Sequence, residues 1–248
     1  MKRLLLLILL LLLIFPATNA QLWKSKRYEL YGGIGTSQFY GDVGGYTPGE
    51  NAIGLKDIIL SQTRFSVMGG MRYRFYETFA VKATFSYAML HASDEKGSNV
   101  DRGYEVTTSL LEPSVTAEYY FLKNKVESLY RYSKGKSVFT SIFEMLDAYV
   151  FAGVAPVFYN VNPNESLAAV NEKDGGVAVA FPVGLGLNFV TSPNVMLGID
   201  LGIRYTTTDY LDGYTSQYSN SNDVYSFMTF IFTYKLKTSK TGLPSFRK

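Results

Sequence analysis

Apolar and polar residues alternate along much of the chain with a period of two. Between Phe79 and Met89 the odd positions are apolar, and the even positions are small or polar. The same alternation runs through Val177–Phe189 and Val195–Tyr205, and in the latter the face opposite the aliphatic side chains carries Asp200 and Arg204. Because successive side chains of a strand point to opposite faces, this pattern predicts strands with one apolar and one polar face.

Eight segments of this kind can be counted. Their bounds are Arg27–Gly35, Arg64–Tyr76, Phe79–Leu90, Glu105–Phe121, Asp147–Phe158, Val177–Val190, Val195–Tyr210 and Asp223–Leu236. In the fourth segment the adjacent Leu110 and Leu111 indicate a change of phase, which predicts a β-bulge. The contrast between faces is too low to assign a phase to the fifth.

The alternating runs favour a membrane barrel over a soluble one. A soluble barrel that buries its apolar face would show the same alternation. Runs of eleven to thirteen residues, however, exceed the ~5–6 residues of globular strands and match the ~9–11 that tilted strands need to cross a bilayer. The expected fold is therefore all-β, an eight-stranded antiparallel transmembrane β-barrel.

The N-terminus predicts a signal peptide over residues 1–20. Lys2 and Arg3 precede the apolar run Leu4–Phe15, and the small residues Thr18 and Ala20 suit a signal peptidase. Export together with a barrel predicts the outer membrane of a Gram-negative bacterium, with both termini in the periplasm. The barrel would occupy residues 21–236, with a long periplasmic connection at 122–146 and a basic periplasmic tail at 237–248.

Composition narrows the possible functions. The 248 residues include 20 Tyr, 17 Phe and 22 Gly but one Trp, which is typical of an all-β chain. With no Cys and one His, the chain can form neither a thiolate site nor a multi-His metal centre. Without Lys2 and Arg3 the chain keeps 22 basic against 21 acidic side chains, so a nucleic-acid binder is not indicated.

Charged residues on the polar faces of the strands are expected to point into the lumen. They are Glu29, Arg72, Arg74, Lys82, Glu112, Glu118, Asp200, Arg204 and Lys235. Eight strands enclose a space just wide enough to fill with side chains, so these charges should pair across a filled lumen. This argues against a porin.

The residue types of catalytic and metal sites occur, but in unfavourable patterns. His91, Ser93, Asp94 and Glu95 are neighbours in a predicted exposed loop, whereas a nucleophile, its base and its orienting group usually converge from separate segments. The acidic residues near the loop bases lack the dense spacing of a calcium loop, and capping of turns is the better interpretation of Asp209 and Asp212. These acidic residues are Asp42, Asp57, Asp209, Asp212 and Asp223. We expect no catalytic, cofactor or metal site, no small-molecule substrate and no enzymatic activity.

The connections between segments divide into two classes. Short turns at Glu77–Thr78 and Thr191–Asn194 would face the periplasm. The outer connections are longer: Thr36–Thr63, His91–Tyr104, Tyr159–Gly176 and Asp209–Asn222. Leu122–Leu146 breaks the rule, because it is long yet falls on the periplasmic side.

Charge is distributed unevenly between the two ends. The outer connections carry twelve acidic side chains, Asp223 at their edge included, against four basic ones, and the inner side carries twelve basic against three acidic. A basic inner side could steer an acidic periplasmic partner, or it could favour anionic lipid. The docking candidates are the basic residues Lys123, Lys125, Arg131, Lys134 and Lys136 and the apolar residues Phe139, Ile142, Phe143 and Leu146.

Three stretches together resemble a known family. They are YELYGGIG at Tyr28–Gly35 leading into QFYGD at Gln38–Asp42, YVFAGVAPVFYNVNP at Tyr149–Pro163, and GIRYTTTDYLDGY at Gly202–Tyr214, in which TDYLD at Thr208–Asp212 is the most specific run. They are similar to the PorG-like outer-membrane barrels of Bacteroidota, which are components of the type IX secretion system. The resemblance covers about Tyr28 to Leu236, and Leu122–Leu146 is not part of its pattern.

The resemblance implies an eight-stranded outer-membrane barrel associated with a periplasmic ring, formed by a PorK-like lipoprotein and a PorN-like partner. Two other functions remain open. One is an OmpX-like barrel that binds extracellular ligands through its loops, and the other is an outer-membrane enzyme that modifies lipid. Docking requires an elaborated periplasmic side, which Leu122–Leu146 supplies.

Overall fold

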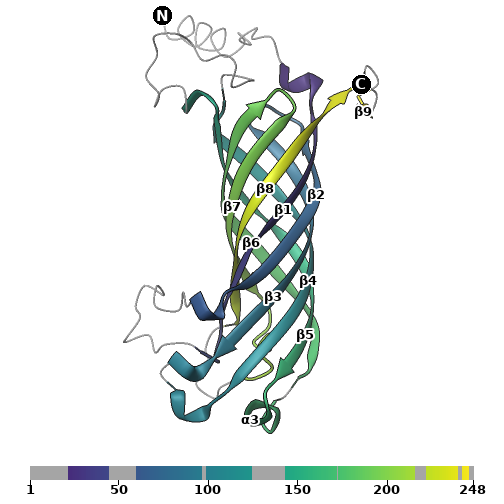
Figure 1. The fold of residues 1–248 in the computed structure, drawn as a ribbon. Coiled ribbons are helices and arrows are strands. Elements are labelled where there is room, and N and C mark those ends of the chain that lie inside the picture. The colour runs from purple at the N-terminus through teal and green to yellow at the C-terminus, as the bar shows by residue number, and fades with distance from the viewer. Residues whose placement is uncertain are drawn as a thin grey trace, which may run out of the picture.

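Long antiparallel strands make up almost all of the structure, a computed structural model that describes residues 22–44, 60–96, 99–124, 143–171, 173–215, 222–239 and 242–245. Eight of them form the barrel: β1 Tyr28–Tyr40, β2 Arg64–Arg74, β3 Phe79–Ser93, β4 Glu105–Leu122, β5 Leu146–Pro163, β6 Gly175–Ser192, β7 Val195–Thr206 and β8 Val224–Thr238. Each pairs with the next, and β8 pairs back onto β1, which closes the sheet (Figure 1). The predicted fold class is confirmed.

The two ends of the barrel differ in their connections. Turns of a few residues join β2 to β3 and β6 to β7 at the end where β1 begins and β8 ends, which we call the short-turn end (Figure 1). A short strand, β9 Pro244–Ser245, pairs with the last residues of β8 there. At the opposite, long-connection end lie the short helices η3 Leu60–Gln62, η4 Asp94–Lys96, η5 Val100–Arg102 and α3 Glu165–Ala168. Near the N-terminus η1 spans Leu22–Ser25.

Strand phase follows the sequence pattern with one exception. The predicted bulge near Leu110 and Leu111 is wrong: burial alternates without a break through that part of β4, with Leu110 inside. The register of β4 against β5 shifts only between Tyr120 and Leu122. Two adjacent leucines occur because the lumen itself is apolar at this height, so both faces of β4 take an apolar side chain.

The outer wall is apolar, as a lipid-facing surface must be. Large aliphatic and aromatic side chains, among them Val154, Val183, Leu201 and Phe230, are exposed around the barrel. No helix in the described ranges is long and apolar enough to span a bilayer, a finding that does not bear on strands. A closed barrel with an apolar exterior is a transmembrane β-barrel of the outer-membrane type.

Aromatic side chains gather at the wall's ends, but two tyrosines near strand ends point inward. Phe79 and Tyr119 are exposed near the short-turn end, and their ring centroids lie 4.9 Å apart. Tyr120 and Tyr159 are buried in the lumen instead, because they occupy the inward phase of β4 and β5.

The lumen contains two layers of different chemistry. Toward the short-turn end it is filled by charged side chains and aromatic rings, and Tyr120 and Tyr149 pack there with centroids 4.8 Å apart. Toward the long-connection end it is an apolar core that includes Leu90, Leu110 and Leu211. The sequence predicted the polar layer and missed the apolar one.

Candidate functional site

Arg72 is the centre of an ion-pair network inside the barrel. Its side chain is fully buried, its Nη1 lies 2.8 Å from Glu29 Oε2, and its Nε lies 2.6 Å from Glu118 Oε2. Arg74 pairs with the other oxygen of Glu29 at 3.1 Å. Tyr120 donates its hydroxyl to Glu118 at 2.8 Å. The four charges come from β1, β2 and β4, so the network ties these strands together through the lumen.

Two further groups continue the pairing across the lumen. Lys82 on β3 pairs with Asp200 on β7, and Asp200 also accepts a hydrogen bond from the Tyr149 hydroxyl. Nearer the apolar core, Arg204 lies 3.4 Å from Glu112. The prediction that inward charges pair across a filled lumen is confirmed for eight of the nine residues named, and the ninth, Lys235, is half-buried at the short-turn end.

Aspartates at the long-connection end hold three connections over the mouth of the barrel, an arrangement we call the cap. Asp212, in the connection between β7 and β8, accepts the backbone N–H of Val43 and of Tyr214, each at 3.1 Å. Asp223 accepts the N–H of Leu211 at 2.7 Å. Asp94 accepts the N–H of Gly44 at 2.8 Å. The predicted turn-capping role is confirmed for Asp212.

Burial of the cap aspartates perturbs their titration. Desolvation raises the pKa of Asp212 to about 7, and the nearby charges of Asp42 and Asp209 act in the same direction. Burial and then the charge of Asp212 raise the pKa of Asp223 well above its usual range. The described residues contain no group of three or more acidic, His or Cys side chains that could hold a metal ion. Backbone hydrogen bonds to these carboxyl groups hold the cap.

Three of the four residues considered for catalysis do not lie in an exposed loop, so the expectation is wrong for these three, whereas Glu95 is exposed. His91 and Ser93 belong to β3, Asp94 opens η4, and all three are buried because the β1–β2 and β3–β4 connections fold over them. His91 Nδ1 lies 3.0 Å from Thr107 Oγ1. Ser93 Oγ accepts the backbone N–H of Glu95 at 3.3 Å, so its described hydrogen bond is not to His91.

Three of the nine docking candidates fall on described residues. Lys123 Nζ lies 2.8 Å from both carboxylate oxygens of Asp147, and burial, together with the charge of Arg74, lowers the pKa of Lys123 to about 8. Phe143 is 57 % exposed and Leu146 is half-buried at the start of β5. Lys125, Arg131, Lys134, Lys136, Phe139 and Ile142 lie outside the described residues. Sequence reasoning missed Asp147, whose partner is 24 residues away.

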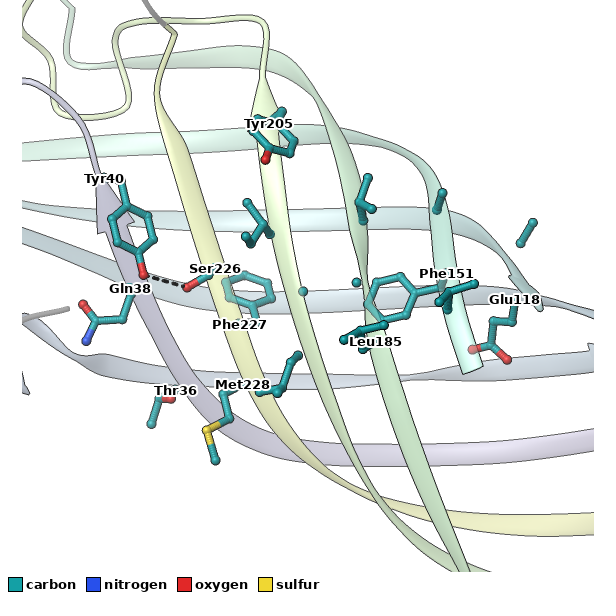
Figure 2. Close-up of a pocket in the computed structure, with 18 of the residues that line it drawn as sticks. Thr36, Gln38, Tyr40, Glu118, Phe151, Leu185, Tyr205, Ser226, Phe227 and Met228 are labelled. Atoms are coloured by element: carbon teal, nitrogen blue, oxygen red, sulfur yellow. Dashed lines mark hydrogen bonds between the residues drawn. The ribbon is translucent and has the colours of Figure 1, made fainter. Parts of the chain in front are cut away.

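A hollow of about 1080 Å³ lies on the outer wall. It crosses β4 to β8 and ends on β1, where Thr36, Gln38 and Tyr40 follow one another along the strand (Figure 2). The Tyr40 hydroxyl and Ser226 Oγ lie 3.4 Å apart at this end. The remaining lining is mainly aliphatic and aromatic, so the hollow, which we call the wall groove, faces lipid.

Comparisons with known proteins match nearly the whole chain to one family. A family model described as a domain of unknown function, DUF6089, matches residues 2–241. No curated protein sequence matches the chain.

Several solved barrels resemble the fold at low identity. Neisserial surface protein A is 11 % identical with a TM-score of 0.46, covering 84 % of this chain and 96 % of that one. OprG from Pseudomonas aeruginosa is 8 % identical with a TM-score of 0.43, covering 85 % and 94 %. Ail of Yersinia pestis, in complex with a heparin analogue, is 13 % identical with a TM-score of 0.40, covering 84 % and 96 %.

Proposed function

The chain belongs to the DUF6089 family, and we propose that it is an outer-membrane component of the type IX protein secretion system that docks a periplasmic lipoprotein ring. The observation that carries the proposal is the filled lumen. Arg72, Glu29 and Glu118 are fully buried and paired inside the barrel, and a cap covers the long-connection end. A barrel closed in this way has no continuous path for a transported protein, which leaves its surfaces as the place of action.

Features of the short-turn end favour it as the docking surface. The first barrel strand begins there and the last one ends there, which suits two periplasmic termini. The connection between β4 and β5 opens from this end, and the Lys123–Asp147 pair fixes where it leaves the barrel. Phe143 is exposed beside it, and Lys24 and Lys237 are exposed at the same end. Apolar contacts rimmed by basic charge suit an acidic protein partner.

The proposed partner class is supported by the resemblance of Tyr28–Gly35, Tyr149–Pro163 and Gly202–Tyr214 to PorG-like barrels. In that system the partners are a PorK-like ring lipoprotein and a PorN-like protein. We propose the same classes here, with residues 125–142, Phe143 and Leu146 as the contact segment.

We propose that the chain is not an enzyme. Of its potential catalytic residues, His91 is hydrogen-bonded to Thr107, and Ser93 Oγ accepts a backbone N–H. Glu105 lies 3.7 Å from His91 Nε2, so the described contacts around His91 do not join a nucleophile, a base and an orienting group in sequence.

The test replaces residues 125–142 by a short polar turn, which keeps Lys123, Asp147 and every barrel strand. We expect this variant to insert in the outer membrane but to lose the periplasmic lipoprotein on affinity capture, and to stop type IX secretion. A matched control shortens the β3–β4 connection at residues 97–98 and should keep both the captured lipoprotein and type IX secretion. Full retention of the lipoprotein by the correctly inserted 125–142 variant would overturn the assignment.

A further inference from the structure

The wall groove lies between two rows of outward side chains that run across the strands. One row consists of directly paired residues, Tyr119, Val150, Leu185, Leu201, Met228 and Thr36. The next consists of Ala117, Ala152, Val183, Ile203, Ser226 and Gln38, paired in the same way. Since strands lie ~4.8 Å apart, six of them give the groove a length of about 24 Å.

Small residues line one side and the floor of this groove. The short side chains of Ala117 and Ala152 leave space along one side of the groove. Between the two rows, the floor includes the paired Gly184 and Gly202. A Cβ at Gly184 would lie 2.5 Å from the Phe151 ring, which packs against the two glycines from the lumen. The floor is therefore closed, and the space above it opens only toward the bilayer.

The two ends of the groove have different chemistry. Across β4 to β7 its outward lining is Tyr119, Val150, Leu185 and similar side chains. On β8 and β1 the lining becomes hydrogen-bonding but uncharged, with Ser226, Gln38 and Tyr40, and Thr63 joins them from just before β2. Gln38 Nε2 donates to Thr63 Oγ1, which holds the amide at the surface of the wall.

The polar end lies at the depth of lipid head groups. Gln38 is ten residues beyond Tyr28 on β1. With a rise of ~3.3 Å per residue and a strand tilt of ~40°, this places Gln38 about 25 Å from the short-turn rim, the height of the apolar band of such barrels. An occupant of the groove therefore has its apolar part among acyl chains and its head at the interface.

We propose that the wall groove binds one acyl chain of a glycolipid in the leaflet at the long-connection end, with the sugar hydroxyls hydrogen-bonded by Gln38, Tyr40 and Ser226. A lipid is the occupant because the groove opens only onto the bilayer and its walls are apolar. An uncharged sugar head suits the polar end because its donors and acceptors are an amide and hydroxyls. The inference is independent of docking at the short-turn end.

The test measures lipid retained by the whole barrel in native mass spectrometry. Protein is reconstituted in phosphatidylcholine nanodiscs that contain a monoglycosyl diacylglycerol with the same acyl chains, then released into an amine-oxide detergent. We expect the wild type to retain about one glycolipid, at least five-fold above its retention of phosphatidylcholine. Ala152→Phe, which fills the groove, should lower glycolipid retention at least five-fold.

Ala83→Phe is the matched control, because Ala83 is also an exposed alanine of the outer wall but does not line the groove. It should retain the glycolipid like the wild type. Ala117→Phe repeats the filling test if Ala152→Phe fails to fold. Gln38→Leu with Ser226→Ala should keep a lipid but bring the two lipids to equal retention.

Two results would overturn the proposal. Equal glycolipid loss in Ala83→Phe and Ala152→Phe would mean that the retained lipid is not held in the groove. Equal retention of both lipids by the wild type would refute the assignment of the polar end to a sugar head.

Discussion

Replacing Arg72 by methionine tests whether the lumen network holds the barrel together. Methionine keeps much of the arginine's length but removes the guanidinium, which leaves Glu29 and Glu118 buried with part of their compensating charge missing. Removing one partner of a buried ion pair costs about 3–5 kcal/mol, because the remaining charge has lost its counterion. Arg74 still lies 3.1 Å from Glu29, and Lys82 still lies 3.8 Å from Glu118. We therefore expect the free energy of unfolding to fall by about 3–5 kcal/mol, and not by twice that amount, although two carboxylates lose a partner.

The assay is reversible urea unfolding in lipid vesicles, with folded and unfolded protein separated by gel mobility. Arg72→Met together with Glu118→Gln should recover at least half of the lost free energy of unfolding, because Glu29 still pairs with Arg74 and Lys82 still pairs with Asp200. Glu77→Gln, at an exposed turn residue, is the control and should lie within about 0.5 kcal/mol of the wild type. An Arg72→Met barrel as stable as the wild type would refute the reasoning.

Other predictions concern the wall, the lumen and the cap. Leu201→Arg should cost about 2–4 kcal/mol in the same unfolding assay if it lies near the bilayer midplane, and unchanged stability would contradict the lipid-facing phase of β7. Pure protein in planar bilayers should give no stable conductance, since the lumen is filled, and reproducible single-channel steps would contradict this. Because the pKa of Asp212 is raised from 3.8 to about 7, the folded cap holds a proton that the unfolded chain releases. The contribution of protonated Asp212 to the stability of the cap is therefore complete below about pH 4 and is lost as the pH rises through about 7. Hydrogen exchange of the Val43 and Tyr214 amides, corrected for intrinsic rates, measures this loss. Asp212→Asn with Asp223→Asn should remove that pH dependence, and an unchanged profile would rule out these carboxyls as its source.

Local alternation predicted the barrel but not what fills its mouth. The eight segments, and the inward phase of residues such as Arg72 and Asp200, follow from a period-two pattern within each strand. The bulge expected at Leu110 and Leu111 is absent because the inward face of β4 joins an apolar core near the cap. That core depends on Leu211, from a connection that is about a hundred residues away in sequence, and a strand's own pattern carries no sign of it.

Among the site residues, too, the contacts within strands were predictable from the sequence and those made by the connections were not. Pairing of Arg72 with Glu29 was predictable in kind because both belong to the inward faces of paired strands. The burial of His91 and Ser93 was not predictable, because it depends on Gln62 of η3, whose Nε2 donates to the Ser93 carbonyl at 2.8 Å. Connections fold over the barrel mouth by long-range contacts, and single-sequence periodicity does not encode these.

The central claim, that the short-turn end docks a periplasmic protein, is tested most directly by crosslinking in cells. A photo-reactive amino acid is placed at Phe143 on the short-turn end or at Val100 on the long-connection end, which are 57 % and 55 % exposed and so equally accessible. The account predicts a specific crosslink to a periplasmic ring lipoprotein from position 143 and none from position 100. Crosslinks to that lipoprotein from position 100, or none from position 143 in a correctly inserted barrel, would contradict it.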